Sequence, residues 1–518
     1  MLTVLAAAVL YGCSSSPAPA VGSGSGSGGA GGGLVPDAGM APPDAGMMPP
    51  DAGMMPDSSM PPDSGMMPPD AGEPDGSSPD ASVPPVVSAP AIACADAVAD
   101  VYVTPANLPP MTLAARGDLV RCAPDAKLTL TDVSSQVMAK GITTPMTTGV
   151  NLFRVAFRTE RGDDSPGVST ARVYLPSTPQ SLPLPVIVIG HPTSGLAPSC
   201  TPSLDASSNQ DLALPWAGLG YAVIVPDYAG LGNEGVQSYL DNHDQGHAVL
   251  DGARALRKLL PDGAFSSSVL AVGYSQGGGA VLSAQALAPS YGVDGTLAGV
   301  IVFAPQWPTR LNSFGYVDEL NDPAKLTIAT GISQNVVTVM MTYGYFYNRV
   351  GPTHATDGFP AASRSGIDNA VKTLCQVPLG GYLQITAPKV GDLFDPTLRT
   401  TLLACIAGKG QGPDCVDPGQ SFYNYLTQNL LTGDPNGPPM LFVQGLVDYI
   451  MPAASEAACN IDKLHKDGVT PQVCVDGLAQ HETVVARNMD FALKWAQALL
   501  GSQPLPTCSS AGMPVCTP

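Results

Sequence analysis

A serine between glycines is the residue of this 518-residue sequence best suited to act as a nucleophile. The segment Gly273-Tyr-Ser275-Gln-Gly277 directly follows an apolar run, residues 269–273, and precedes a stretch that favours a helix. A serine on such a sharp strand-to-helix turn presents its hydroxyl to a substrate carbonyl. Glycines are needed beside it because side chains there would collide with the strand and the helix. Ser275 is therefore the predicted nucleophile.

A serine hydroxyl needs a general base, and the sequence contains six histidines. When a nucleophile lies on a strand–turn–helix of this kind, the chain order is serine, acid, histidine. Three histidines follow Ser275. His354 falls in a long segment without clear strands, and His465 lies in an expected helix before the last strand. His481 comes just after the expected strand 472–475 and is the predicted base, with an exposed loop histidine as the alternative interpretation.

The acid that orients this histidine is predicted to be Asp448. It lies on the turn after the apolar run 440–444, where a carboxylate at a strand end can reach a histidine. The rivals are Asp434, which precedes that strand, and Asp476, which is close to the base in sequence. Serine, histidine and aspartate in this relation form a catalytic triad.

Two backbone N–H groups must stabilise the oxyanion that forms when a serine attacks a carbonyl. One is expected from Gln276, the residue after the nucleophile. The other is expected from the loop 191–195, His-Pro-Thr-Ser-Gly, which follows the apolar run 186–190. Pro192 has no N–H, so Thr193 is the predicted second donor. Hydroxyl groups of the loop are further candidates.

The elements that must position these residues alternate between strands and helices. Apolar runs without alternation are typical of strands buried in a parallel sheet. Helix-like stretches separate them, which predicts a layered α/β fold. Two runs, 152–158 and 168–175, alternate better and could form an antiparallel pair at the sheet edge. The other expected strands are 186–190, 222–226, 269–273, 299–303, 440–444 and 472–475, and the expected helices are 244–260, 276–288 and 482–500.

One long segment interrupts this rhythm. Residues 305–439 contain no clear buried strand, and a connection of that length is not a loop. We interpret the segment as an inserted, mostly helical cap over the end of the sheet. It would separate two parts of one core, residues 91–304 and 440–518.

The first 90 residues differ from the rest. Residues 1–13 form a short apolar segment typical of a signal peptide. Its ending, Leu10-Tyr-Gly-Cys13, resembles a bacterial lipobox, which would make Cys13 a lipidated N-terminus. An ordinary cleaved signal is the alternative. Residues 14–90 are rich in Gly and Ser and then repeat Pro-Asp eight times, without Lys, Arg or aromatic residues. This composition predicts a disordered spacer.

Composition narrows the classes of function. The net charge is −20 with only 23 Lys and Arg, and we find no basic patch of the kind that nucleic-acid binding requires. No apolar run reaches the roughly 18 residues needed to cross a bilayer. His243 and His247 have the spacing of a helical zinc pair but lack the glutamate of that motif. No metal or other cofactor is implied.

Cysteine usage agrees with export. Without Cys13, the 11 cysteines leave ten, an even number that allows five disulfides. Sequence alone does not determine the connectivity, but close spacing suggests the pairs Cys405–Cys415, Cys459–Cys474 and Cys508–Cys516.

Several short segments of the sequence, taken in order, resemble those of the secretory lipases, which are lipase-A-like α/β-hydrolases of fungi and bacteria. The resemblance spans about residues 90 to 510 and rests on the segments at 191–203, 226–232, 251–255, 273–278, 445–448, 481–482 and 501–508. It implies an α/β-hydrolase fold with a mostly parallel central sheet and helices on both faces. It also implies a helical cap, a triad without metal, and hydrolysis of carboxylic esters, often of lipids. A disulfide from Cys200 to a cap cysteine, most simply Cys375, is implied too. One departure is Pro192, where bacterial members usually have glycine.

The expected protein is an exported, lipid-anchored serine ester hydrolase, a triacylglycerol lipase or a carboxylesterase. Its partners would be an ester or lipid substrate and, through the anchor only, a membrane. Two alternatives stay open: a peptidase or polyester hydrolase on the same fold, and a non-enzymatic surface binding protein. Asp227 and Tyr228 follow an expected strand and are candidates for substrate binding, although a structural turn explains them equally well.

Overall fold

The computed structural model describes residues 94–178, 182–205, 207–261, 263–307, 328–386 and 390–517. All described residues belong to the second of the two units into which the chain divides, Pro79–Pro518. The expected signal peptide and spacer, with Cys13, therefore lie outside the described residues. Within the described part, no helix combines the length and apolar character needed to cross a membrane.

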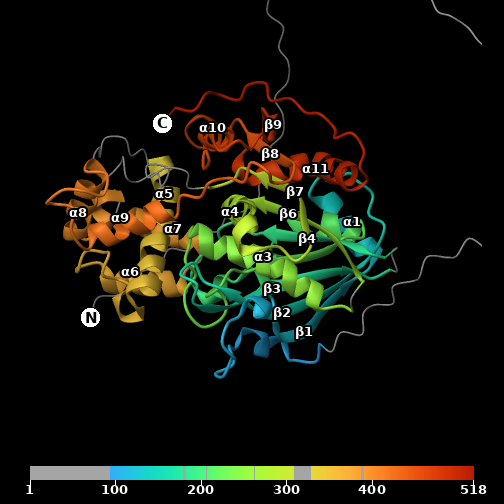
Figure 1. Cartoon of the computed structure of the whole chain (residues 1–518), viewed down its shortest axis with the longest axis horizontal. Helices are drawn as coiled ribbons and strands as arrows, with labels where there is room; N and C mark the ends of the chain where they lie inside the picture. Colours follow the sequence, from blue (N-terminus) through green and yellow to red (C-terminus); the bar gives the residue numbers. More distant parts are fainter. Residues whose placement is uncertain are drawn as a thin grey trace, which may run out of the picture. The chain divides into compact units, whose positions relative to one another are not determined.

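A mostly parallel sheet forms the centre of the described chain (Figure 1). Its strand order is β1-β2-β3-β5-β4-β6-β7-β8-β9. Neighbours from β1 to β5 are antiparallel, and all neighbours from β5 to β9 are parallel. The strands are β1 (Leu119–Leu128), β2 (Val150–Glu160), β3 (Pro166–Pro176), β4 (Leu184–Gly190), β5 (Ala222–Pro226), β6 (Phe265–Tyr274), β7 (Thr296–Phe303), β8 (Met440–Gly445) and β9 (Gln472–Asp476).

Every expected strand is present, but β1 was not predicted from the sequence. This strand contains Pro124 and several charged residues, and its pairing with β2 shifts register between Pro124 and Lys127. Proline is tolerated at sheet edges because an edge strand leaves half of its N–H groups without a ladder partner. The pair β2–β3 is antiparallel, as expected, but β1 lies outside it and forms the edge.

Helices cover both faces of the sheet, which confirms the expected layers. Three helices pack in one apolar cluster with the sheet: α3 (Asn242–Lys258), α4 (Gln276–Tyr291) and α10 (Ala458–Lys466). Three others pack in the cluster on the opposite face: α1 (Leu130–Ala139), α2 (Gln210–Gly218) and α11 (Val484–Leu500).

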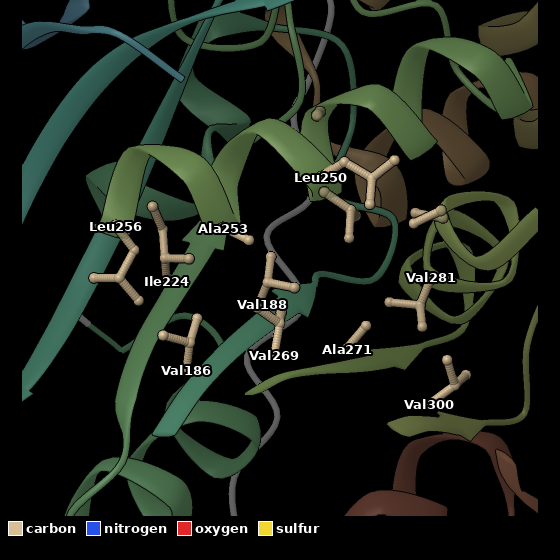
Figure 2. Close-up of a cluster of buried hydrophobic side chains, with 14 of the residues drawn as sticks. Val186, Val188, Ile224, Leu250, Ala253, Leu256, Val269, Ala271, Val281 and Val300 are labelled. Carbon is tan, nitrogen blue, oxygen red and sulfur yellow. The ribbon is translucent and has the colours of Figure 1, made fainter. Parts of the chain in front are cut away.

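The buried strands supply side chains to both clusters. In β4, Val186 and Val188 belong to the cluster of α3 and α4, whereas Ile187 and Ile189 belong to the opposite one. Figure 2 shows the first cluster, where Leu250 of α3 lies above the strand side chains. Successive strand residues point to opposite faces, so a strand covered on both sides is apolar throughout.

Between β7 and β8, the described part of residues 305–439 contributes no strand to the sheet. It forms α5 (Ile328–Tyr345), α6 (Arg364–Thr373), α7 (Gln376–Thr386), α8 (Pro396–Ala407) and α9 (Gly419–Gln428). These helices pack around an apolar cluster of their own, which includes Phe346 and Phe422. Leu196, Tyr239 and Leu240 from the loops that follow β4 and β5 join that cluster, so it continues onto the core.

Five disulfides connect the described cysteines, and one of the three pairs suggested by spacing is present. The bonds are Cys94–Cys122, Cys200–Cys375, Cys405–Cys415, Cys459–Cys516 and Cys474–Cys508. The suggested pairs Cys459–Cys474 and Cys508–Cys516 are wrong because the segment after α11 runs back along β9. The N–H of Val475 donates to the carbonyl of Ser509 at 2.8 Å, and that of Thr517 donates to Ala454 at 3.1 Å.

The two histidines of α3 lie in a packed environment. His247 is buried and stacks on Tyr291 with ring centroids 3.9 Å apart. One turn further along α3, Asp251 forms an ion pair with Arg254 at 2.5 Å. Nowhere in the described ranges do three or more His, Cys, Asp or Glu side chains gather in a way that could hold a metal ion.

Three glycines let α4 approach the sheet closely. Gly190 ends β4, Gly273 lies opposite it in β6, and Gly277 opens α4. A Cβ atom on Gly277 would lie 1.9 Å from the carbonyl oxygen of Gly190, and one on Gly273 would lie 2.2 Å from that of Gly277. Backbone atoms cannot move aside as a flexible side chain can, so these positions exclude every larger residue.

We predict that Gly277→Ala lowers the free energy of unfolding by at least about 2 kcal/mol, because the added methyl group forces strand and helix apart. The matched control is Gly381→Ala in α7, where a Cβ atom meets nothing within 4 Å. Higher helix propensity should make that variant up to about 1 kcal/mol more stable. Chemical unfolding of both variants measures the difference, and equal stabilities would contradict the prediction.

Candidate active site

Ser275 occupies a strained turn between β6 and α4, as its motif predicts. Its backbone angles are φ 53° and ψ −121°. Such a conformation is costly for a residue with a side chain and persists only where the surroundings enforce it. Here the N–H of Ser275 donates to the carbonyl of Phe303 at 3.0 Å, and its own carbonyl accepts from Gln306 at 2.9 Å. The turn is therefore held by the end of the neighbouring strand β7 and the loop after it.

The structure brings the three predicted triad residues together in one hydrogen-bonded chain. His481 Nε2 lies 2.9 Å from Ser275 Oγ, and His481 Nδ1 lies 2.8 Å from Asp448 Oδ2. All three residues are buried, with 5 to 6% of each exposed. These distances allow the histidine to take the serine proton while the carboxylate holds the ring orientation.

Backbone donors fix the carboxylate of Asp448. Its Oδ1 accepts from the N–H groups of Ile450 at 2.9 Å and Met451 at 2.7 Å, which leaves Oδ2 for the histidine. The buried amide of Gln444 donates to the carbonyl of Met451 at 3.0 Å and so fixes the same turn. Gln444 is a positioning residue that sequence reasoning missed.

The rival residues lie in other networks. Asp476 pairs with Arg487 at 2.7 Å, and the carboxylate of Asp434 caps its own turn at the N–H of Asn436. Of the rival histidines, His354 pairs with Asp357 at 2.7 Å, and His465 is exposed on α10.

Tyr274, the residue before the nucleophile, also holds the histidine. Its hydroxyl donates to the carbonyl of His481 at 2.9 Å, and the two rings lie 5.0 Å apart. Burial raises the pKa of Tyr274 above its ordinary value, so the hydroxyl remains a donor. The only sequence signal for this role is the position of Tyr274 inside the serine motif.

The two predicted oxyanion donors, Thr193 and Gln276, follow the ends of two neighbouring parallel strands, β4 and β6. Gly190 pairs with Gly273 in the sheet, so the loop carrying Thr193 and the turn before Gln276 leave neighbouring strands at the same edge. In the described chain, neither backbone N–H is bonded to a protein acceptor. The hydroxyl of Thr193 lies 2.8 Å from that of Tyr239.

The same loop is tied to the helical segment 305–439. Gly195 forms an isolated antiparallel bridge with Cys375, and the N–H of Gln376 donates to the carbonyl of Ser194 at 2.9 Å. The disulfide Cys200–Cys375, which the family resemblance implies, is present beside this bridge.

Asp227 and Tyr228, the candidates for substrate binding, are completely buried. The carboxylate of Asp227 accepts from the hydroxyl of Thr170 at 2.7 Å, from the N–H of Ser203 at 2.9 Å and from the Ser203 hydroxyl. The hydroxyl of Tyr228 donates to the carbonyl of His191 at 3.0 Å. Their complete burial favours the interpretation that these two residues form a structural turn over the interpretation that they bind substrate.

We predict that Asp227 makes stability depend on pH. Burial raises its pKa from 3.8 to about 7, although hydrogen bonds from Ser203 and Thr170 oppose the rise. Because the folded state binds this proton more tightly, the stabilisation is fully present below about pH 4. It is lost as pH rises through about 7. Relative to the wild type, Asp227→Asn should therefore gain about 2 kcal/mol between pH 5 and pH 8.

Chemical unfolding at the two pH values measures this change. The control Asp462→Asn removes a carboxylate of which 45% is exposed and should leave the pH dependence unchanged. A difference between Asp227→Asn and the wild type that stays constant with pH would contradict the prediction.

Two of the solved structures that resemble this fold are ester hydrolases by name. One is the rice cell wall degrading esterase LipA from Xanthomonas oryzae, with a TM-score of 0.58 and 20% identity over 75% of this chain and 100% of that chain. The other is Candida antarctica lipase A in its closed state, with a TM-score of 0.56 and 18% identity over 80% and 88%. The chain therefore has the predicted α/β-hydrolase fold. No curated protein sequence matches it.

The family described as Secretory lipase matches residues 210–312. That segment runs from α2 past the end of β7 and contains the turn of Ser275, but it ends before Asp448 and His481. The family match over this segment, together with the shared fold, confirms the resemblance of this chain to the secretory lipases.

Proposed function

We propose that this protein is a serine carboxylic-ester hydrolase with the triad Ser275, His481 and Asp448. The observation that carries the proposal is the continuous hydrogen-bonded chain from the serine hydroxyl through the imidazole to the carboxylate. The family match and the names of the two structural neighbours, an esterase and a lipase, support the class of reaction.

In the proposed mechanism, Ser275 Oγ attacks the ester carbonyl carbon while His481 Nε2 takes the hydroxyl proton. The carbonyl oxygen becomes negative and is stabilised by the N–H groups of Gln276 and Thr193. The intermediate collapses, and the departing alkoxide takes the proton from His481. Water then attacks the acyl-enzyme by the same route, which releases the acid. Asp448 keeps the imidazole in the tautomer that carries its proton on Nδ1.

We propose that residues 305–439 form the cap that selects the substrate. Two observations support this role: its ties to the loop of Thr193, and the continuity of its apolar cluster with Leu196 and Tyr239 of the core. A position above the oxyanion loop would let the cap limit which acyl and alcohol groups reach Ser275. Its apolar, tyrosine-rich interior suits acyl chains.

We expect Ser275→Ala to abolish hydrolysis of p-nitrophenyl esters from acetate to palmitate, with a fall of at least about 10³-fold in kcat, because no other group can form the acyl-enzyme. The wild type should hydrolyse these esters, and its chain-length optimum distinguishes an esterase from a lipase.

Two controls accompany this assay. Ser283→Ala removes a buried hydroxyl of the same helix that donates only to the carbonyl of Gly279, and it should keep the activity. His465→Ala changes an exposed histidine and should keep it too, whereas His481→Ala should lose it. Folded wild-type protein that hydrolyses no ester would refute the proposal and favour a peptidase or a binding protein.

We also propose export with a lipid anchor on Cys13. The lipobox-like ending of residues 1–13, the five disulfides and the description of the family as secretory support this proposal. The spacer 14–90 would then hold the enzyme away from the membrane surface.

Expressed from its full-length gene in a bacterial host, the protein should partition into the detergent phase of a Triton X-114 extract. Cys13→Ala should move it to the aqueous phase, because an acyl chain contributes about 0.8 kcal/mol per buried CH₂ group. Ser14→Ala is the matched control and should remain in the detergent phase. Wild-type protein in the aqueous phase would exclude the anchor.

A further inference from the structure

His191 is buried at the start of the loop that carries the second oxyanion donor. Its Nδ1 lies 2.6 Å from the carbonyl oxygen of Pro192, the next residue in the chain. A carbonyl oxygen only accepts hydrogen bonds, so Nδ1 carries a proton and donates it. The side chain of His191 therefore turns back onto the backbone of its own loop.

The other ring nitrogen has no such role. His191 Nε2 is buried, and no hydrogen bond joins it to another of the described residues. Burial lowers the pKa of His191 to about 4, although the hydrogen bond to the Pro192 carbonyl opposes the fall. The ring is thus neutral near pH 7 and has one proton to donate, which the contact with Pro192 places on Nδ1.

The bond to Pro192 controls the direction of an N–H group on the next residue. The carbonyl of Pro192 and the N–H of Thr193 belong to one planar peptide unit, and this peptide is trans. In a trans peptide the C=O and the N–H point in opposite directions. Holding the Pro192 carbonyl toward His191 therefore aims the Thr193 N–H away from the imidazole.

Proline makes this control nearly complete. The orientation of the peptide between Pro192 and Thr193 depends on φ and ψ of Pro192, and the pyrrolidine ring fixes φ. Only ψ remains free, and the bond from His191 Nδ1 holds it. Position 192 is the one where bacterial members of the family usually have glycine. Here the proline ring and the hydrogen bond from His191 together fix the orientation of the peptide between Pro192 and Thr193.

Tyr228 fixes the histidine itself. Its hydroxyl donates to the carbonyl of His191 at 3.0 Å, and the two ring centroids lie 4.4 Å apart. Tyr228 is completely buried and lies on the turn after β5 with φ 68°. The main chain and the ring of His191 are therefore both held from β5, independently of the segment 305–439.

We propose that His191 is the positioning residue of the oxyanion hole: its Nδ1–H holds the Pro192–Thr193 peptide so that the Thr193 N–H faces the developing oxyanion. This inference rests on the proposed function, which assigns Thr193 as a donor. His191 acts through the backbone of Thr193 and touches no reacting atom.

Two substitutions at this position carry the same amide group on side chains that differ in length by one methylene, so they place the amide N–H differently. In His191→Asn the amide nitrogen can take the place of Nδ1, whereas in His191→Gln it takes the place of Nε2 and cannot reach the Pro192 carbonyl. We expect His191→Gln to lower kcat for p-nitrophenyl butyrate by about tenfold or more. The largest decrease in kcat to expect is about 10²–10³-fold, which is the effect of removing one oxyanion donor completely. KM should stay within about threefold, because the donor acts on the transition state.

Inhibition by phenylboronic acid, which becomes tetrahedral on the serine oxygen, should weaken in His191→Gln by a factor similar to that of kcat. His191→Asn should recover kcat and inhibition at least in part. Tyr228→Phe keeps the ring and removes the hydroxyl, and it should lower kcat in the same way but less. His465→Gln makes the same change at an exposed site and should match the wild type.

A folded His191→Gln variant with wild-type kcat and inhibition overturns the positioning role. Equal losses in His191→Asn and His191→Gln also overturn it, because a merely structural role would not distinguish the two amides. If His191→Gln does not fold, a Tyr228→Phe variant with unchanged kcat overturns it. The Ser275→Ala control keeps the two questions separate. If the wild type hydrolyses esters and Ser275→Ala does not, the proposed function stands even when the positioning role of His191 fails. A wild type that hydrolyses no ester refutes both proposals.

Discussion

The hydrogen bond between His481 and Ser275 joins residues that are 206 positions apart in the chain, and the rest of the structure serves to keep it short. Ser275 follows β6 and His481 follows β9, with β7 and β8 between them in the sheet. Parallel strands end at a common edge, so side chains from distant segments meet there. The spacing of these buried strands therefore sets the distance between Ser275 and His481.

The sequence was sufficient for the parts of this arrangement that local pattern controls. Unbroken apolar runs mark strands that are covered on both faces. Chain order and position after a strand predict Asp448 and His481, and the structure brings these two side chains within hydrogen-bond distance of each other. It was insufficient where the controlling contact is remote. β1 carries a proline that only an edge position tolerates, and Cys474 meets Cys508 because the segment after α11 folds back. The contact of Tyr274 with the His481 carbonyl spans 207 residues and leaves no local pattern.

The loop between Gly190 and Cys200 is held from two independent directions. From the sheet side, Tyr228 fixes the backbone and ring of His191. From the helical segment, a β-bridge and a disulfide fix Gly195 and Cys200 through Cys375. A hole that stabilises an oxyanion works because its dipoles are already oriented when charge develops. In the proposed mechanism, two anchors on one short loop would supply that orientation before substrate binds.

The Cys200–Cys375 disulfide closes a covalent ring that spans 175 positions of sequence and contains Ser275. A protease that cuts the chain once inside this ring opens it but cannot release either fragment. Ser275, the loop of Thr193 and the helices α5 and α6 would remain parts of one molecule after such a cut. If the protein is exported, as proposed, this connectivity would keep the fragments together after a single cut by a protease.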